Sequence, residues 1–136
     1  MQGEPVLVAD DDPMNRKLLA IILKGEGHEV TTVEDGVEAI DIIKRKEFKA
    51  IVLDLLMPEV SGFEVVQHLI AHNPMILERV IILTGLDEKY TGRFDHSLFY
   101  AFATKPIDRV TIAALVTACV RGEPRPSAIP GDETAG

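Results

Sequence analysis

Four carboxylates stand directly after two short apolar runs of the chain. Asp10, Asp11 and Asp12 follow the run that begins at Val6, and Asp54 ends the run that begins at Ala50. Clustered carboxylates repel one another, and each resists ionisation unless a cation lies between them. Mg²⁺ takes oxygen ligands and often bridges to a phosphoryl group. If the fold brings these acids together, the pattern predicts a metal site, although an acidic loop with a helix cap explains the first three when they are taken alone.

A hydroxyl and a lysine occupy equivalent places later in the chain. Thr84 ends the apolar run 80–83, and Lys105 comes shortly after the run 101–103. Each has a simple structural explanation, as a hydroxyl beside a turn glycine and as a solvated lysine. Their convergence favours a function, because each follows an apolar run just as the acids do. A lysine and a hydroxyl beside a metal site are suited to binding a phosphoryl group.

The elements that would position these residues are five strands alternating with helices. Apolar runs bounded by polar residues indicate strands, and helical spacing after Asp12-Pro13, Asp35-Gly36, Ser61 and Asp108 indicates helices. The strands are expected at 6–9, 29–33, 50–53, 80–83 and 101–103. This order predicts an α/β fold with a doubly wound, five-stranded parallel sheet. In such folds the working site lies at the carboxyl ends of the strands, where all the residues above would meet.

Composition excludes several classes of protein. The chain has 136 residues, enough for one domain, which we expect over 1–121, with a Pro/Gly-rich disordered tail or linker at 122–136. The net charge of −8 argues against direct nucleic-acid binding. One cysteine permits no internal disulfide, and no apolar stretch approaches the ~20 residues of a membrane span. We therefore expect a cytoplasmic protein with no membrane contact.

Four motifs in order resemble the receiver domain of two-component response regulators. They read VLVADDDP at 6–13, IVLDLLMPEVSG at 51–62, VIILTG at 80–85 and FATKPID at 102–108. The resemblance covers about residues 4–121 and implies a flavodoxin-like (βα)5 fold. Between Thr84 and Lys105 the chain is one residue shorter than the commonest spacing in that family. Residues 87–99 also depart from its pattern, with Gly92 inside the expected fourth helix, so either a shorter helix or a modified surface is possible there.

The resemblance assigns a role to each candidate residue. Asp54 would accept the phosphoryl group, and Mg²⁺ (or Mn²⁺) would be bound by Asp11 directly, by Asp10 through water, by Asp54 and by the backbone carbonyl of Leu56. Thr84 and Lys105 would contact the phosphoryl oxygens. Thr84 would then move inward and allow the aromatic residue Phe102 to turn in, which reshapes the face formed by the fourth helix, fifth strand and fifth helix.

The implied function is signalling through protein contacts. The chain would take phosphate from a histidine kinase or a histidine phosphotransfer protein and act on a downstream protein partner or output domain. It would not be an enzyme beyond its own phosphorylation and dephosphorylation. Two alternatives are a metal-dependent phosphohydrolase with an Asp nucleophile and a phosphorylation-independent adaptor. The first is disfavoured because Asp54 is followed two residues later by Leu56, and the second because the acids, Thr84 and Lys105 are all present.

Two further predictions concern rate and assembly. Leu56 and Leu86 stand where a side chain could orient a hydrolytic water, and neither can form a hydrogen bond, so we expect a long-lived aspartyl phosphate. The last helix is apolar nearly all round. Ile112, Ala113, Val116, Cys119 and Val120 are assigned to the sheet, which leaves an opposite arc, including Val110 and Leu115, for a partner or homodimer. His68 and His72, four residues apart on a helix, are expected to face solvent.

Overall fold

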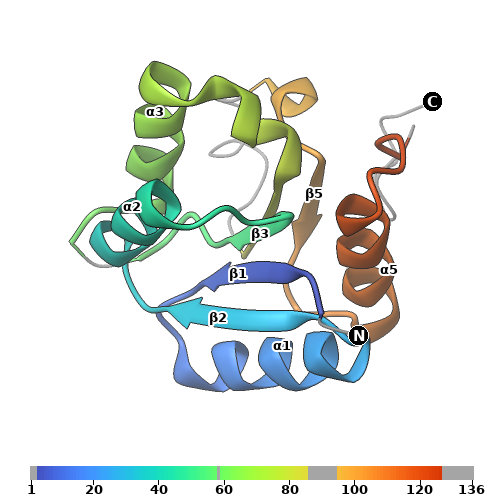
Figure 1. Cartoon of the computed structure of the whole chain (residues 1–136). Helices are drawn as coiled ribbons and strands as arrows, with labels where there is room; N and C mark the ends of the chain where they lie inside the picture. The colour runs from blue at the N-terminus through green and yellow to red at the C-terminus, as the bar shows by residue number, and fades with distance from the viewer. Residues whose placement is uncertain (1–2, 58, 86–94, 127–136) are drawn as a thin grey trace.

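A computed structural model of the chain describes residues 3–57, 59–85 and 95–126. The predicted alternation of strands and helices is confirmed (Figure 1). In chain order the elements are β1 (Pro5–Ala9), α1 (Pro13–Gly25), β2 (Glu29–Val33), α2 (Gly36–Arg45), β3 (Ala50–Leu53), α3 (Gly62–His72), the 3-10 helix η1 (Pro74–Arg79), β4 (Val80–Thr84), the 3-10 helix η2 (His96–Leu98), β5 (Ala101–Thr104) and α5 (Arg109–Val120). Strand boundaries fall within one residue of those predicted.

Four helices begin at a side chain that caps them. Asp12, Asp35, Ser61 and Asp108 are extended in backbone conformation, and each side chain accepts a hydrogen bond from a backbone N–H of the first helical turn. Such caps satisfy amides that have no partner inside the helix. Proline at the first position of α1 adds to this, because it has no N–H to satisfy. The helix starts were therefore readable from short polar signals.

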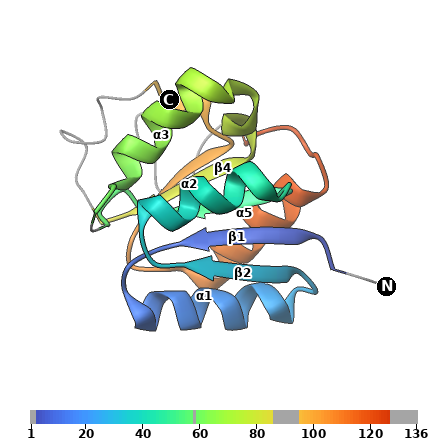
Figure 2. The same cartoon turned by 60° about the vertical axis from the view of Figure 1, so that its left-hand side comes forward.

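The five strands form one parallel sheet in the order β2-β1-β3-β4-β5. Helices α2 and α3 cover one face, and α1 and α5 cover the other (Figure 2). The two apolar layers explain why β3 and β4 are buried on both faces and read as continuous apolar runs. The doubly wound α/β architecture predicted from the sequence is confirmed.

The last helix does not lie as its apolar pattern suggested. Leu115, which we assigned to the outer arc, is only 7% exposed and packs in the same cluster as Ile112, Val116 and Tyr100. Val110 from that arc is 76% exposed, as expected. The error has a physical cause: a helix that is apolar nearly all round gives no periodic signal to choose its buried face.

On α3 the side chain of Val65 is fully buried, whereas that of Ile70 is exposed. The segment Glu123–Pro126 was expected within a disordered tail, but it contacts the domain through hydrogen bonds from Tyr100 and Arg125. Most of the irregular stretch 87–99, including Gly92, lies outside the described residues. Within the described parts of the chain, no helix is long and apolar enough to cross a membrane.

Candidate functional site

The two central strands deliver the buried acids side by side. In the β1–β3 register Ala9 lies opposite Leu53, so Asp10 and Asp54, the next residue of each strand, leave the sheet together. The backbone N–H of Asp54 donates to the Ala9 carbonyl at 2.9 Å, which fixes that spacing. The strand order reverses between β1 and β3, and this is where doubly wound sheets place their sites. Asp10 and Asp54 are 2% and 4% exposed.

Lys105 reaches these acids from the end of β5, the edge strand next to β4. It follows β5, and its N–H donates to the Thr84 carbonyl at 2.9 Å. Its Nζ lies 2.9 Å from Oδ2 of Asp54 and 3.0 Å from Oδ2 of Asp10. The Lys105–Pro106 peptide bond is cis. One ammonium group therefore balances part of the charge of two buried carboxylates.

Asp11 completes a group of three acids. Carboxylate oxygens of Asp10, Asp11 and Asp54 all lie within 4.8 Å of one another. Asp11 is exposed, while its two companions are buried. A compact all-oxygen set with one ligand open to solvent fits a hard divalent cation that keeps part of its water shell. The donor set therefore fits Mg²⁺.

Backbone N–H groups bond the second carboxylate oxygen of each buried acid. Oδ1 of Asp10 accepts from the Asp12 N–H at 2.9 Å, and Oδ1 of Asp54 accepts from the Leu56 N–H at 3.1 Å. Gly62, the first residue of α3, packs against this loop so closely that a Cβ there would overlap the Asp54 carbonyl oxygen. The geometry of the acids is thus set by main-chain contacts that need a glycine at position 62.

The surroundings of Asp54 and Lys105 shift the pKa values of both side chains. Burial raises the pKa of Asp54 above its ordinary value, and this effect outweighs the hydrogen bonds from Lys105 and the Leu56 N–H, which act in the opposite direction. Burial alone would lower the pKa of Lys105, but its hydrogen bonds to Asp54 and Asp10 raise it. Lys105 therefore remains protonated, and Asp54 is a more basic carboxylate than an exposed aspartate.

Thr84 and Phe102 lie on neighbouring strands beside the acids. Thr84 is fully buried at the end of β4 and pairs in register with Thr104, two residues after Phe102. The Phe102 ring is 6% exposed and stacks against His96, with ring centroids 4.0 Å apart and an interplanar angle of 7°. In this structure the aromatic residue is already packed in the core cluster.

Two contacts near the site were not found from the sequence. Arg16 of α1 donates from Nη1 to the Asp10 carbonyl at 2.8 Å, and its Nη2 lies 3.4 Å from Glu34. The stacking of His96 on Phe102 joins η2 to β5. Neither has a local signal, because a long side chain reaching a backbone carbonyl and a ring stack across a turn leave no spacing to read.

The water-orienting position predicted beside Asp54 is open to solvent. Leu56 is 52% exposed, and its side chain offers no hydrogen-bonding group. Leu86, its predicted companion, lies outside the described residues.

The His68 and His72 rings, 4.5 Å apart on α3, are half-buried and exposed, respectively. Neither histidine belongs to the group formed by Asp10, Asp11 and Asp54.

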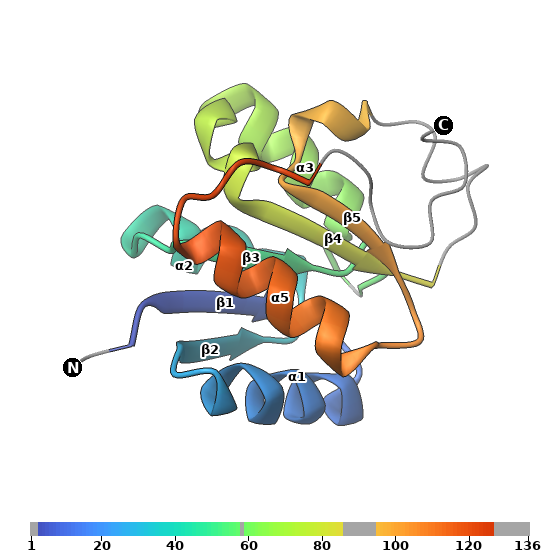
Figure 3. The same ribbon diagram turned by 90° about the vertical axis from the view of Figure 1, so that its right-hand side faces the viewer.

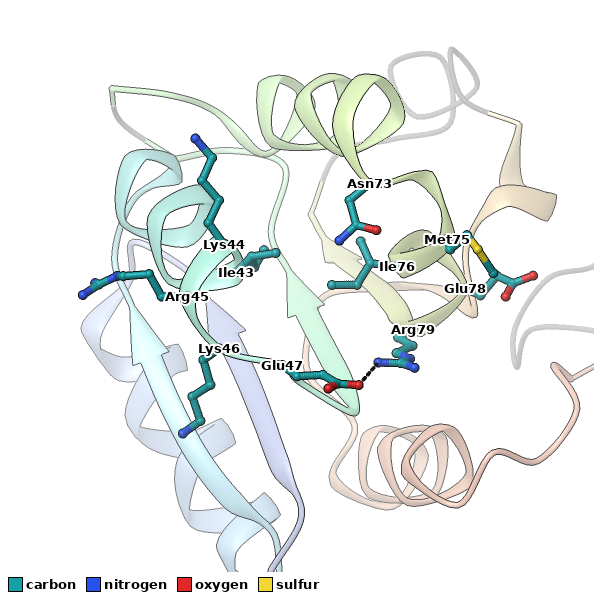
Figure 4. A pocket seen from close by; sticks show the side chains of 10 residues that line it. All are labelled: Ile43, Lys44, Arg45, Lys46, Glu47, Asn73, Met75, Ile76, Glu78 and Arg79. Atoms are coloured by element: carbon teal, nitrogen blue, oxygen red, sulfur yellow. Dashed lines mark hydrogen bonds and ion pairs between the residues drawn. The ribbon is translucent and has the colours of Figure 1, made fainter.

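A cavity of about 420 Å³ lies at the opposite end of the strands from the acids, between the end of α2 and η1. Its lining includes basic, acidic and apolar side chains, and the basic ones do not converge. Figure 4 shows Arg45 and Lys46 pointing away from Arg79, which is paired with Glu47 at 3.4 Å. Arg45 and Lys46 pair with acids on the surface. The residues that line this cavity therefore do not form a cluster of charged side chains like the one at the carboxyl ends of the strands.

Comparison with known proteins agrees with the geometry. The chain matches the response regulator receiver domain family over residues 6–117. It is 35% identical over 92 residues to a probable transcriptional regulator, ycf27, of Porphyridium aerugineum, covering 68% of this chain and 38% of that protein. Response regulator RR06 of Streptococcus pneumoniae is 32% identical over 117 residues, covering 85% of this chain and 52% of that protein. The chain thus spans about a third to a half of the length of these curated relatives.

Solved structures give the same result. The receiver domain of the Francisella response regulator 1452 superposes with a TM-score of 0.78 at 29% identity, covering 88% of this chain and 98% of that one. TrrA of Thermotoga maritima, solved in complex with Mg²⁺ and BeF, gives 0.75 at 27% identity, covering 85% and 98%. The sheet order, the acidic cluster at its carboxyl edge and these matches lead to one conclusion: the chain belongs to the response regulator receiver domain family of two-component signalling.

Proposed function

We propose that Asp54 is the phosphoacceptor of this receiver domain. One observation carries the proposal: Asp54 is a buried carboxylate at the end of a central strand, 2.9 Å from the Lys105 ammonium and beside two further acids. Burial raises its pKa, and a more basic carboxylate is a better nucleophile toward phosphorus. Asp11 is exposed, and of the two buried acids it is Asp54 that stands at the acceptor position of the family's motif.

The proposed reaction transfers a phosphoryl group from a histidine to Asp54. An Asp54 carboxylate oxygen forms the new bond to phosphorus, the phosphorus–nitrogen bond of the donor breaks, and its electron pair stays on the imidazole nitrogen, which takes up a proton. Lys105 balances charge on the transferred group, and the Thr84 hydroxyl donates a hydrogen bond to its oxygens. The donor would be a histidine kinase or a histidine phosphotransfer protein.

The metal ligands follow from the same cluster. Asp10, Asp11, Asp54 and the Leu56 carbonyl would hold Mg²⁺ (or Mn²⁺), with Asp10 acting through water. When bound, the ion offsets the negative charge of the acids and of the phosphoryl oxygens. The all-oxygen donor set within 4.8 Å supports this assignment.

Phosphorylation would act on the face built by β5 and α5. A phosphoryl group on Asp54 gives Thr84 a new acceptor, and Thr84 lies on the strand that pairs with β5. Movement there changes the packing of Phe102, as in a two-state switch biased by a local charge. We propose that this face, with exposed Val110 and Ala114 on α5, contacts a downstream partner, an output domain or a second copy.

The proposal assigns no catalytic turnover to the chain beyond its own phosphorylation and dephosphorylation. A phosphohydrolase with an Asp nucleophile is the alternative closest in chemistry. Family membership and the Leu56 that follows Asp54 by two residues both favour the receiver.

Intact-protein mass spectrometry tests the phosphoacceptor. We expect wild type to gain one phosphoryl group on incubation with a small phosphodonor and Mg²⁺, and to gain none with EDTA. Asp54→Asn should gain none, whereas Asp41→Asn, an exposed acid on α2, should behave as wild type. An adduct on Asp54→Asn would show that the acceptor is a different residue.

A further inference from the structure

Arg16 joins two loops that lie beside the acidic cluster. Its Nη1 donates to the Asp10 carbonyl at 2.8 Å, and its Nη2 lies 3.4 Å from the Glu34 carboxylate. Arg16 belongs to the first turn of α1, and Glu34 directly follows β2. Figure 3 shows the start of α1 at the end of the molecule to which the arrows of β1 and β2 point. The Arg16 side chain is only 18% exposed, so its guanidinium is held at this place by its two partners.

The bond from Arg16 completes the hydrogen bonds of Asp10. The N–H of Asp10 donates to the Val33 carbonyl at 3.2 Å. Its two carboxylate oxygens are bonded by the Asp12 N–H and by the Lys105 ammonium. The carbonyl is the remaining polar group of Asp10, and Arg16 bonds it. The backbone of Asp10 is therefore held on one side by β2 and on the other by α1.

The Asp10 carbonyl belongs to the peptide group that leads to Asp11. Because a peptide group is planar, a bond that fixes the carbonyl of Asp10 also fixes the N–H of Asp11 and restricts the position of its Cα. Asp11 is exposed, whereas Asp10 and Asp54 are buried and their carboxylates are bonded by backbone N–H groups. Of the three acids, Asp11 therefore depends most on its backbone for its position.

Mg²⁺ is more sensitive than Ca²⁺ to the position of a ligand. Mg²⁺ is small and requires a nearly octahedral arrangement of oxygens, whereas Ca²⁺ accepts more ligands in more variable geometry. Groups that orient a metal ligand without being ligands themselves are typically worth about 10–100-fold in metal affinity. A displacement of Asp11 should therefore weaken the binding of Mg²⁺ more than the binding of Ca²⁺.

We propose that Arg16 is a positioning residue of the magnesium site, which holds the peptide group before Asp11 and thereby sets the preference of the acidic cluster for Mg²⁺ over Ca²⁺. The inference rests on the proposed magnesium site and adds to it a residue outside the ligand set. Glu34 offsets the charge of Arg16 and orients the second arm of its guanidinium. A planar guanidinium holds two partners in a fixed fork, which a lysine ammonium does not reproduce.

Two simpler roles of Arg16 predict different results. If Arg16 acted through its charge alone, its removal would strengthen the binding of both divalent cations, because like charges repel. If Arg16 only stabilised the fold, its removal would weaken the binding of both cations by the same factor. A positioning role predicts weaker binding of both cations with a larger loss for Mg²⁺. The ratio of the Ca²⁺ and Mg²⁺ dissociation constants therefore separates the three roles.

The test measures both dissociation constants by NMR, from the shifts of backbone amides in the full chain as MgCl₂ or CaCl₂ is added at constant ionic strength. Arg16→Gln keeps a polar side chain that is too short to reach the Asp10 carbonyl. We expect this variant to bind Mg²⁺ about tenfold more weakly than wild type, with a smaller loss for Ca²⁺. Arg45→Gln removes an exposed arginine of α2, paired with Asp41, and should equal wild type for both cations.

Two further variants separate the arms of the guanidinium. Arg16→Lys keeps the charge and a side chain long enough to reach the Asp10 carbonyl, so its ratio of dissociation constants should lie between those of wild type and Arg16→Gln. Glu34→Gln removes only the exposed partner, and it should change the Mg²⁺ affinity by less than about threefold. Without metal, the amide signal of Asp11 should shift in Arg16→Gln and stay in place in Arg45→Gln.

The outcomes separate the inference from the function beneath it. Tighter binding of both cations by Arg16→Gln, or an unchanged ratio of their dissociation constants, would overturn the positioning role and leave the magnesium site. If Arg16→Gln does not fold, Arg16→Lys decides, and a ratio equal to that of wild type would overturn the positioning role. Absence of Mg²⁺ binding by wild type would contradict the proposed magnesium site and, with it, the positioning role.

Discussion

The acidic edge of the sheet and the β5–α5 face are held by different kinds of contact. At the edge, Asp10 and Asp54 leave two central strands that are paired on both sides, and each carboxylate is bonded by a backbone N–H and by Lys105. On the β5–α5 face, an edge strand follows a 3-10 helix of three residues. In addition to the apolar packing of α5 on the sheet, that face is held by a ring stack and by hydrogen bonds to the segment Glu123–Pro126.

This difference suits the two regions to different tasks. A carboxylate that receives a phosphoryl group needs charged partners in fixed positions, and the two central strands hold those partners in place. A face that must change shape needs contacts that are few and local, because such regions open with low free energy. We therefore expect substitutions at the acidic edge to affect stability and chemistry strongly, and substitutions on the β5–α5 face to shift equilibria with smaller effects on stability.

The largest effect is expected where α3 meets the strand that carries Asp54. Gly62→Ala places a methyl group against the Asp54 carbonyl and should lower the free energy of unfolding by about 3 kcal/mol. Gly25→Ala, at the end of α1 with open space around it, should be neutral or slightly stabilising. Urea denaturation of both variants measures this. Equal stability of Gly62→Ala and wild type would show that the edge is not rigid.

Lys105 should be the next most important residue for stability. Lys105→Met leaves two buried carboxylates without their cation, which we expect to cost about 2 kcal/mol in EDTA. Added Mg²⁺ should recover most of that loss, because the same acids would hold it. Lys46→Met removes an exposed pair with Glu29 and should cost less than about 0.5 kcal/mol. A Lys105→Met protein that Mg²⁺ does not stabilise would argue against the metal site.

The lifetime of the aspartyl phosphate tests the side chains beside Asp54. Leu56→Asn combined with Leu86→Glu provides groups that can orient water, so we expect dephosphorylation about tenfold faster than in wild type. Ile21 of α1 is likewise apolar and exposed, so Ile21→Asn serves as the control and should leave the rate unchanged. The rate is followed by loss of the phosphoryl mass after removal of the donor. An equal or slower rate in the double variant would contradict the prediction.

The smallest effect on stability is expected at the exposed start of α5. Val110→Glu should change the free energy of unfolding by less than about 0.5 kcal/mol, since Val110 is exposed. Light scattering behind a sizing column, with and without beryllofluoride, shows whether wild type self-associates and whether Val110→Glu prevents it. Met14→Glu, on the exposed side of α1, is the control. A wild type that is monomeric in both states would remove self-association from the functions of this face.

The sequence predicted the acidic edge better than the responding face, for a physical reason. Apolar runs, caps and strand-end acids are local, and parallel strands bring their carboxyl ends together without further information. The contacts of Arg16 and Arg125 with backbone carbonyls depend on the final fold. Leu115 was misplaced because an evenly apolar helix has no periodicity to mark its buried face. Gly122, which follows α5 with a φ of 73°, is a local signal for the chain reversal after that helix, but the prediction from the sequence did not use it.

Amide hydrogen exchange with and without Mg²⁺ and beryllofluoride tests most directly whether modification of Asp54 at the acidic edge changes the structure of the β5–α5 face. We predict faster exchange in peptides spanning residues 95–104, with little change in peptides spanning β1 and β3. Asp54→Asn should show no difference between the two conditions. Unchanged exchange over 95–104 in wild type, or the same change in Asp54→Asn, would contradict the account.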